Sequence, residues 1–288
     1  MVKPPTTYKQ QLELLKQRGC IIEDEAFALK ILEDINYYRL SAYFLPFKDE
    51  EKYIEGTSFN NVIAIYEFDR KVRSLLLSLM EGLEKRLRAQ IAYFHAHKYG
   101  ALGYLDEKNL NTKHNHADFI DNIDRVKHSN RQTLIVRHHE EKYEGNFPIW
   151  VIIEFFTFGM LSKFYSDMKR GDQKIISRSL FNRSDAELRS WLFCLTNLRN
   201  KCAHYSCLYY TLFSARPASI KGLDRKMNRK LFDYILIAKE LCKETDYWEK
   251  EYLPAFLSIM KSQNCIQLEH IGFPENWREY LIDIEEES

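Results

Sequence analysis

The sequence predicts an all-α protein, a bundle of helices with little other regular structure. Three features of the 288-residue chain support this class. Apolar residues recur at helical spacing across many turns between residues 58 and 99. Residues 184–205 open with Ser184 and Glu187, which can form a capping box. Aromatic residues make up 14% of the chain, a proportion that suits thick packing between helices.

The first part of the chain is expected to form an N-terminal helical extension over residues 1–57. Thr7 and Asp24 are residue types that cap helices. An aromatic stretch follows them, and we expect it to be a turn that stops at Pro46. The expected elements are helices at 7–18 and 24–36, a turn at 37–47 and a charged surface loop at 48–57.

The second part, residues 58–288, is expected to be a helical domain, or one continuous domain together with residues 1–57. Its longest helix should run from Ser58 to about Tyr99, and Asp69 interrupts the apolar stripe of that helix. We expect Asp69 to pair with a neighbouring Arg or Tyr, because a buried carboxylate needs a partner. Further helices are expected at 117–143, 149–168, 172–181, 184–205, 231–243 and 248–261, and the one at 149–168 is apolar nearly all round.

The composition excludes several classes of protein. The net charge is +1, so nucleic-acid binding would have to come from local basic patches. Six scattered cysteines without a C-x-x-C pair favour a reduced, cytoplasmic protein. The longest apolar run, residues 150–161, is too short to span a bilayer, so no membrane is expected. There is no Gly-rich phosphate loop, and no cofactor is expected.

One segment concentrates groups suited to catalysis. Within residues 184–205, Asn197, Asn200 and His204 follow one line of the expected helix, and Arg199 lies beside that line. Cleavage of RNA by its own 2′-hydroxyl needs a proton transferred near neutral pH, which suits histidine. It also needs charge on the phosphorus-centred transition state to be neutralised, which suits a guanidinium. No metal is required by this set.

Other interpretations of these residue types remain open. Arg199 and His204 could be solvated cations near a helix C-terminus, where the dipole favours them. Residues 221–230 are the most basic patch of the chain and are either phosphate contacts or an ordinary solvated helix start. The H-A-H and H-N-H clusters are expected to be surface histidines. Cys202, His204 and Cys207 are not expected to hold zinc, because residues two apart on a helix diverge.

Five stretches occur in order along nearly the whole chain: Tyr37-Tyr38-Arg39-Leu40 with Pro46-Phe47; Tyr66-Glu67-Phe68-Asp69-Arg70 leading to Glu84 and Arg88; Pro148-Ile149-Trp150 through Phe158-Gly159; Leu198-Arg199-Asn200-Lys201-Cys202-Ala203-His204; and Gly272-Phe273-Pro274-x-x-Trp277. Together they resemble the AbiD/AbiF family of bacterial abortive-infection proteins. Arg199-Asn200-x3-His204 also resembles the R-x(4–6)-H signature of HEPN-domain ribonucleases.

The resemblance implies a HEPN-like helical bundle with additional N- and C-terminal helices. It further implies a toxin-like, metal-independent endoribonuclease that protects against phage, with a small structured RNA as a regulator. By this resemblance Arg199, Asn200 and His204 are the catalytic candidates. The candidates for RNA contact or support, from the resemblance and from the basic patch, are Glu84, Arg88, Asn197, Lys201, Arg225, Lys226 and Arg229.

In HEPN-domain ribonucleases two copies of the R-x(4–6)-H motif, usually from two protomers, meet to form one site. Only one tight motif is present here, so a two-motif site needs a homodimer or the looser pair Arg88 and His95; we expect the homodimer. The alternatives are a non-catalytic module that binds RNA or senses phage, and a purely structural helical adaptor.

Overall fold

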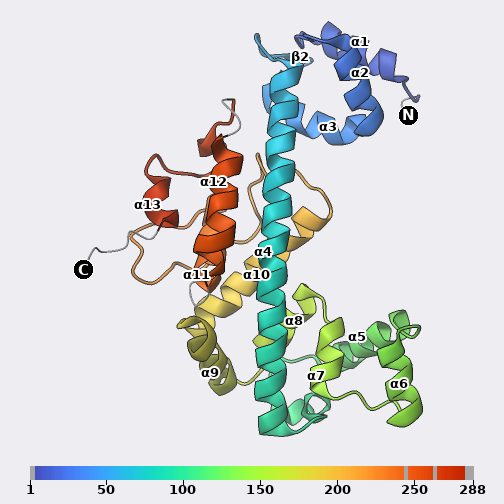
Figure 1. Ribbon diagram of the computed structural model, residues 1–288, viewed down its shortest axis with the longest axis vertical. Coiled ribbons are helices and arrows are strands. Elements are labelled where there is room, and N and C mark those ends of the chain that lie inside the picture. Colours follow the sequence, from blue (N-terminus) through green and yellow to red (C-terminus); the bar gives the residue numbers. More distant parts are fainter. Residues whose placement is uncertain (1–3, 243–245, 262–264, 283–288) are drawn as a thin grey trace.

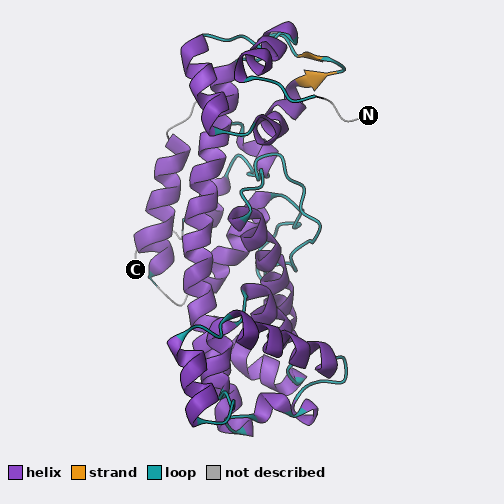
Figure 2. Ribbon diagram, turned by 90° about the vertical axis from the view of Figure 1, so that its right-hand side faces the viewer, coloured by secondary structure: helices purple, strands orange, loops and turns teal. Residues whose placement is uncertain are grey.

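A single long helix forms the axis of the protein. The computed structural model describes residues 4–242, 246–261 and 265–282. Helix α4 (Phe59–Tyr99) contains 41 residues and runs along the whole length of the molecule in Figure 1. Its length corresponds to about 60 Å at the ordinary helical rise. The all-α class is confirmed, and the sheet found in the described ranges is a two-stranded hairpin of β1 (Lys48–Asp49) and β2 (Lys52–Tyr53), orange in Figure 2.

The other helices lie around α4 in four groups (Figure 1). One group lies at the N-terminal end of α4, one at its C-terminal end, one crosses its middle, and one lies along its side. In that order they are α1 (Tyr8–Gln17), α2 (Glu25–Asp34) and α3 (Tyr37–Phe44); α5 (His116–Ser129), α6 (Leu134–Lys142) and α7 (Ile149–Ile152); α8 (Phe158–Asp167), α9 (Arg170–Phe181) and α10 (Asp185–Ala203); and α11 (Leu231–Cys242), α12 (Leu253–Lys261) and α13 (Trp277–Leu281).

Local signals explain the two helices that matter most for function. Ser58 caps α4 by accepting a hydrogen bond from the amide of Asn61, and α4 ends at Gly100, whose φ is +84°. The predicted capping box of α10 is confirmed, since Ser184 and Glu187 satisfy each other's amides. The apolar residues that recur at helical spacing along α10 are all buried: Leu188, Leu192, Leu195, Leu198 and Cys202.

Helix α10 therefore packs against both α4 and α8. Gly159 of α8 makes the second contact close, because a Cβ added there would lie 3.4 Å from the Thr196 methyl. Buried residues form one hydrophobic core that includes Leu12 near the N-terminus and Leu281 near the C-terminus. We infer from this shared core that the segment before α4 folds together with the rest of the chain.

Three expectations from the sequence were wrong, and one open alternative is excluded. The aromatic stretch predicted as a turn is helix α3, because the Asn36 side chain accepts from the Tyr38 amide and caps it. The predicted helix 149–168 is broken: Phe156 is extended, and Thr157 caps α8. The predicted helix 117–143 is two helices, because Thr133 caps α6. Residues 221–230 do not start a helix; α11 begins at Leu231. Lys243, at the end of the helix expected at 231–243, lies outside the described residues.

No helix in the ranges that the structure describes combines the length and apolarity that a bilayer crossing requires.

A buried polar network joins α3, α4 and the chain that follows α10. The Asp69 carboxylate accepts hydrogen bonds from the Tyr43 hydroxyl (2.6 Å), from Arg73 Nη1 (2.6 Å) and from the Leu208 amide (2.9 Å). Arg73 Nη1 also donates to the carbonyl of Ser206 (3.2 Å). The pairing predicted for Asp69 is thus confirmed. Burial raises the pKa of the Asp69 carboxyl, and its three hydrogen-bond donors oppose that rise.

Breaking this network should destabilise the fold strongly. Arg73→Met leaves the Asp69 carboxyl buried without its cation, so we expect the free energy of unfolding in urea to fall by about 3–5 kcal/mol. Arg70→Met is the matched control, because Arg70 pairs with Glu67 on the same helix with its side chain 54% exposed. That pair should contribute less than about 1 kcal/mol. Equal small losses in both variants would contradict the importance of the network.

His95 is a second buried polar group of α4. It is 0% exposed, and its ring lies 4.9 Å from the ring of Tyr99 and 5.4 Å from that of Phe164. Burial lowers the pKa of His95 from 6.5 to about 4. The imidazole is therefore neutral at physiological pH and inaccessible to a ligand.

His95 should make the stability depend on pH. The unfolded chain takes up a proton as the pH falls below about 6.5, whereas the folded chain does so only near pH 4. The free energy of unfolding should thus fall as the pH is lowered from about 6.5 to about 4, and His95 should account for at most about 3 kcal/mol of this loss. His95→Phe should flatten the dependence of the unfolding free energy on pH between 7 and 4. The exposed His97, changed to Phe, is the control, and equal slopes in both variants would refute this role of His95.

Candidate functional site

The predicted catalytic residues lie at the C-terminal end of α10. Arg199 is half-buried, while Asn200 and His204 are exposed. His204 is the residue that ends the helix, and its amide donates to the carbonyl of Asn200 (3.0 Å). Among the described residues, no hydrogen bond or ion pair engages the side chains of these three. They are therefore available to a ligand, within little more than one helical turn.

The chain turns sharply just after His204. The amide of Tyr205 donates to the Cys202 carbonyl (3.1 Å), and that of Ser206 donates to the Lys201 carbonyl (2.9 Å). These two bonds form a Schellman motif, which requires a left-handed residue after the helix. Tyr205 occupies that position with a φ of +56°, although glycine is the usual residue there.

Side chains from α3 and α4 hold this turn in place. Arg39 Nη1 donates to the Tyr205 carbonyl (2.8 Å), Arg73 binds the Ser206 carbonyl, and Asp69 accepts from the Leu208 amide. Side chains that are distant in the sequence thus hold the carbonyls of Tyr205 and Ser206 and the amide of Leu208. Sequence reasoning missed Arg39 as a site residue. The one signal for it was its place in the Tyr37-Tyr38-Arg39-Leu40 stretch.

Asn197 and Lys201 lie on the same helix as the motif. Asn197 is half-buried, and its amide nitrogen is buried without a hydrogen-bond partner in the described part of the chain. Lys201 is half-buried, and its Nζ lies 5.9 Å from the centroid of the Phe213 ring. Both residues can therefore support the motif: Asn197 lies among the packed helices, and Lys201 lies at the surface.

Glu84 and Arg88 do not lie beside the motif of their own chain. Arg88 Nη2 donates to Glu84 and to the carbonyl of Phe156 (2.6 Å). The pair therefore joins α4 to the turn before α8. Arg73 binds the Ser206 carbonyl just after the motif, so this part of α4 lies beside the motif. Arg88 follows Arg73 by fifteen residues on α4, which is about 22 Å along the helix. The looser pair Arg88 and His95 cannot complete a site either, because His95 is buried.

The basic residues of the segment 221–230 differ in their surroundings. Arg225 forms an ion pair with Asp233 (3.1 Å), donates to the Gly272 carbonyl (3.1 Å) and stacks on Phe232, so its guanidinium is engaged within the fold. Lys226 is exposed, and Arg229 is half-buried. The carbonyl of Arg229 accepts from the Phe213 amide (2.7 Å). Because the Phe213 ring also lies beside Lys201, the basic segment lies near the end of α10.

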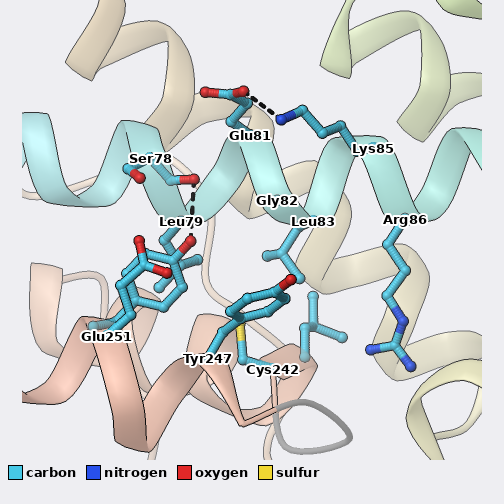
Figure 3. A pocket seen from close by; sticks show the side chains of 12 residues that line it. Ser78, Leu79, Glu81, Gly82, Leu83, Lys85, Arg86, Cys242, Tyr247 and Glu251 are labelled. Atoms are coloured by element: carbon cyan, nitrogen blue, oxygen red, sulfur yellow. Dashed lines mark hydrogen bonds and ion pairs between the residues drawn. The ribbon is translucent and has the colours of Figure 1, made fainter.

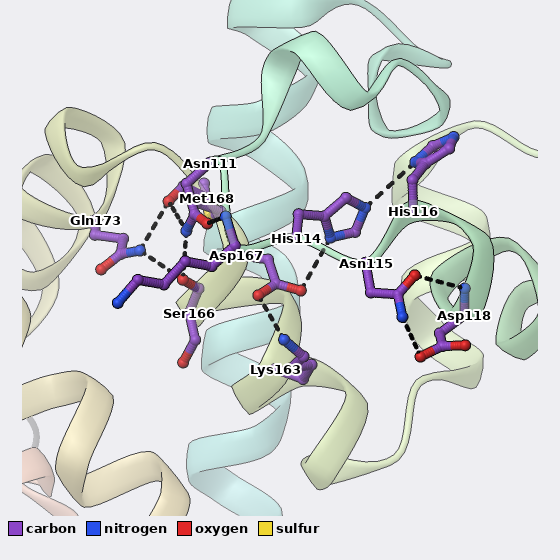
Figure 4. A network of polar contacts seen from close by, with 11 residues as sticks. Asn111, His114, Asn115, His116, Asp118, Lys163, Ser166, Asp167, Met168 and Gln173 are labelled. Atoms are coloured by element: carbon purple, nitrogen blue, oxygen red, sulfur yellow. Dashed lines mark hydrogen bonds and ion pairs between the residues drawn. The ribbon is translucent and has the colours of Figure 1, made fainter.

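A histidine cluster lies where the segment before α5 meets α8 (Figure 4). His114 Nδ1 is 3.0 Å from an Asp167 oxygen, and His114 Nε2 is 3.3 Å from His116 Nδ1. Lys163 pairs with the other oxygen of Asp167 (2.8 Å). The expected surface position is wrong for His114, whose side chain is 2% exposed, and for His95 of the H-A-H cluster, which is 0% exposed. In the ranges covered by the structure, no three His, Cys, Asp or Glu side chains gather as metal ligands.

A pocket lies between α4 and the segment around η5, a π-helical turn at Trp248–Tyr252 (Figure 3). Glu81 and Lys85 on its wall pair with each other (2.7 Å), and Tyr252 donates to the Ser78 carbonyl (3.4 Å). No residue of α10 lines it. Arg86, also on the wall, donates through Nη2 to the Leu180 carbonyl (2.7 Å), and its Nη1 is buried without a hydrogen-bond partner in the described part of the chain.

Comparison with known proteins gives one match. A family model described as Abi-like protein matches residues 30–210. No curated protein and no solved structure matches the chain. The matched range includes Tyr43, Asp69 and Arg73 of the buried network together with the motif on α10, and it ends before the basic segment 221–230. It covers more than half of the chain, and the chain therefore belongs to the Abi-like family of abortive-infection proteins.

Proposed function

We propose that this protein protects against phage as an abortive-infection endoribonuclease of the HEPN type, similar to the AbiD/AbiF subgroup. The observation that carries the proposal is the end of α10. There a rigidly anchored turn presents an exposed His204, with Asn200 and Arg199 close by and without intramolecular partners. We place the activity in the cytoplasm, where cellular and phage RNA are both present.

The proposed reaction needs no metal ion. The 2′-hydroxyl of the RNA attacks the adjacent phosphorus and loses its proton to a base, while the bond to the 5′-oxygen breaks and that oxygen gains a proton from an acid. The products are a 2′,3′-cyclic phosphate and a 5′-hydroxyl. His204 supplies one of these proton transfers. Arg199 neutralises the charge that develops on the phosphoryl oxygens, and Asn200 binds an oxygen or orients the imidazole.

The reaction gives a reason for a homodimer. The attacking and leaving oxygens lie on opposite sides of the phosphorus, so a single imidazole is poorly placed to serve both. A second copy of the chain would bring a second His204. Phe193, 58% exposed, precedes Asn197, Asn200 and His204 by four, seven and eleven residues, which places it on their face of α10. A groove between α8 and α10, lined among others by Gly159, Ser162 and Phe193, adjoins this face. We propose that the face and the groove together form the dimer interface.

His204→Ala should abolish the activity without unfolding the protein. Loss of a general acid or base lowers a rate by about 10²–10⁴-fold, so we expect cleavage of labelled RNA in EDTA to fall by that factor and growth arrest to disappear. The control is His97→Ala, which removes an exposed histidine on α4. If both variants cleave like the wild type, the catalytic role is refuted. If His204→Ala still protects cells against phage, the protein is a non-catalytic RNA-binding or phage-sensing module instead.

Phe193→Asp should separate the protomers. A charge at the centre of an apolar contact cannot be desolvated without a partner, so we expect light scattering to give twice the monomer mass for the wild type and the monomer mass for the variant, together with lost cleavage. Leu134→Asp on α6 is the control, because Leu134 is 76% exposed and lies away from α10. A monomeric wild type that cleaves RNA, or a dimeric Phe193→Asp variant, would refute this interface.

A further inference from the structure

Tyr205 follows His204 directly, and its side chain is 65% exposed. The residue adopts a left-handed backbone, with φ at +56°, which is unfavourable for a bulky L-residue. Glycine would fit the same turn without strain. An exposed ring at such a position adds nothing to the hydrophobic core, so packing does not account for a tyrosine there.

Arg39 of α3 fixes the orientation of this ring. Its Nη1 atom donates to the Tyr205 carbonyl (2.8 Å), and its Cζ atom lies 5.4 Å from the centroid of the Tyr205 ring. The guanidinium thus covers part of one face of the ring and leaves most of the ring accessible to solvent. Tyr38, the neighbour of Arg39 on α3, is 86% exposed. A rigid aromatic surface with an adjacent cation therefore lies immediately beside His204.

We propose that Tyr205 is a stacking platform for an unpaired RNA base, and that the site consequently takes single-stranded RNA. This inference rests on the proposed ribonuclease function and names its class of substrate. A base and its phosphate are joined by one sugar, so a base on Tyr205 holds the neighbouring phosphate within reach of His204 and Arg199. A duplex keeps its bases stacked on one another and offers no free face to the ring. Arg39 acts as a positioning residue for the platform.

The test measures binding separately from cleavage. A short fluorescent single-stranded RNA with 2′-O-methyl groups lacks the attacking hydroxyl, so its affinity for the full-length protein is measurable by anisotropy without turnover. Loss of one base–aromatic stack should weaken binding by about 5- to 150-fold. We expect this loss for Tyr205→Gly, which retains the left-handed turn, and a change of less than about twofold for Tyr205→Phe, which retains the ring.

Two comparisons make the result specific. Tyr93→Ala removes a 64% exposed tyrosine from α4 and should leave the affinity unchanged. A 2′-O-methyl duplex of the same sequence should bind Tyr205→Gly and wild type equally. The melting temperatures of Tyr205→Gly and wild type should agree to within a few degrees, which excludes unfolding as the cause of weaker binding.

The outcomes separate this inference from the proposed function. If Tyr205→Gly binds single-stranded RNA as tightly as the wild type, the platform is refuted even if the enzyme cleaves RNA. The platform is also refuted if the wild type binds no single-stranded RNA, or if single-stranded and duplex RNA lose affinity equally. If binding depends on Tyr205 but the wild type cleaves no RNA, the platform stands and the ribonuclease proposal fails.

Discussion

The candidate site depends on the buried ion pair between Asp69 and Arg73. Two charges inside a core are expensive to desolvate, and here neutral groups offset part of the cost around Asp69 Oδ2 and the Arg73 guanidinium, while Asp69 Oδ1 is buried without a hydrogen-bond partner in the described part of the chain. Tyr43 supplies a hydroxyl, the Leu208 amide supplies a second donor, and the Ser206 carbonyl accepts from the guanidinium. The pair thus converts an unfavourable burial into a fixed position for the chain that follows α10.

This arrangement explains how an exposed motif is held rigidly. A helix end exposed to water usually frays, since its last carbonyls lack partners. At the end of α10 the Schellman turn satisfies the carbonyls of Lys201 and Cys202. Arg39 and Arg73 bind the carbonyls of Tyr205 and Ser206, just beyond the helix. His204 is consequently solvent-exposed on a backbone that has little freedom. Preorganisation of this kind is what catalysis by positioned groups requires.

The sequence predicts those features that depend on neighbouring residues. The caps at Thr7, Asp24, Ser58 and Ser184, and the buried faces of α4 and α10, could be derived because their signals lie within one or two turns. The partners of Asp69 could be predicted by type, because a carboxylate in an apolar stripe needs donors. The break at Thr157 was missed because a long apolar run hid a capping residue.

Features that depend on distant segments could not be derived. Arg39 contacts Tyr205 across 166 residues, and Arg225 is engaged by the Gly272 carbonyl, 47 residues away. Neither contact leaves a local pattern in the sequence. Among the candidate site residues, the placement of Arg199, Asn200 and His204 at the end of one helix was therefore predictable, whereas the means of holding them in place was not.

The long separation of these contacts has a consequence for synthesis. A chain emerges from the ribosome from its N-terminus, so α3 and α4 are complete while the Ser206 and Leu208 backbone that they bind does not yet exist. Until then Asp69 and Arg73 lack two of their partners, and the turn beside His204 cannot be anchored. The candidate site is thus assembled only after the chain has been translated beyond Leu208, and shorter translation products lack it.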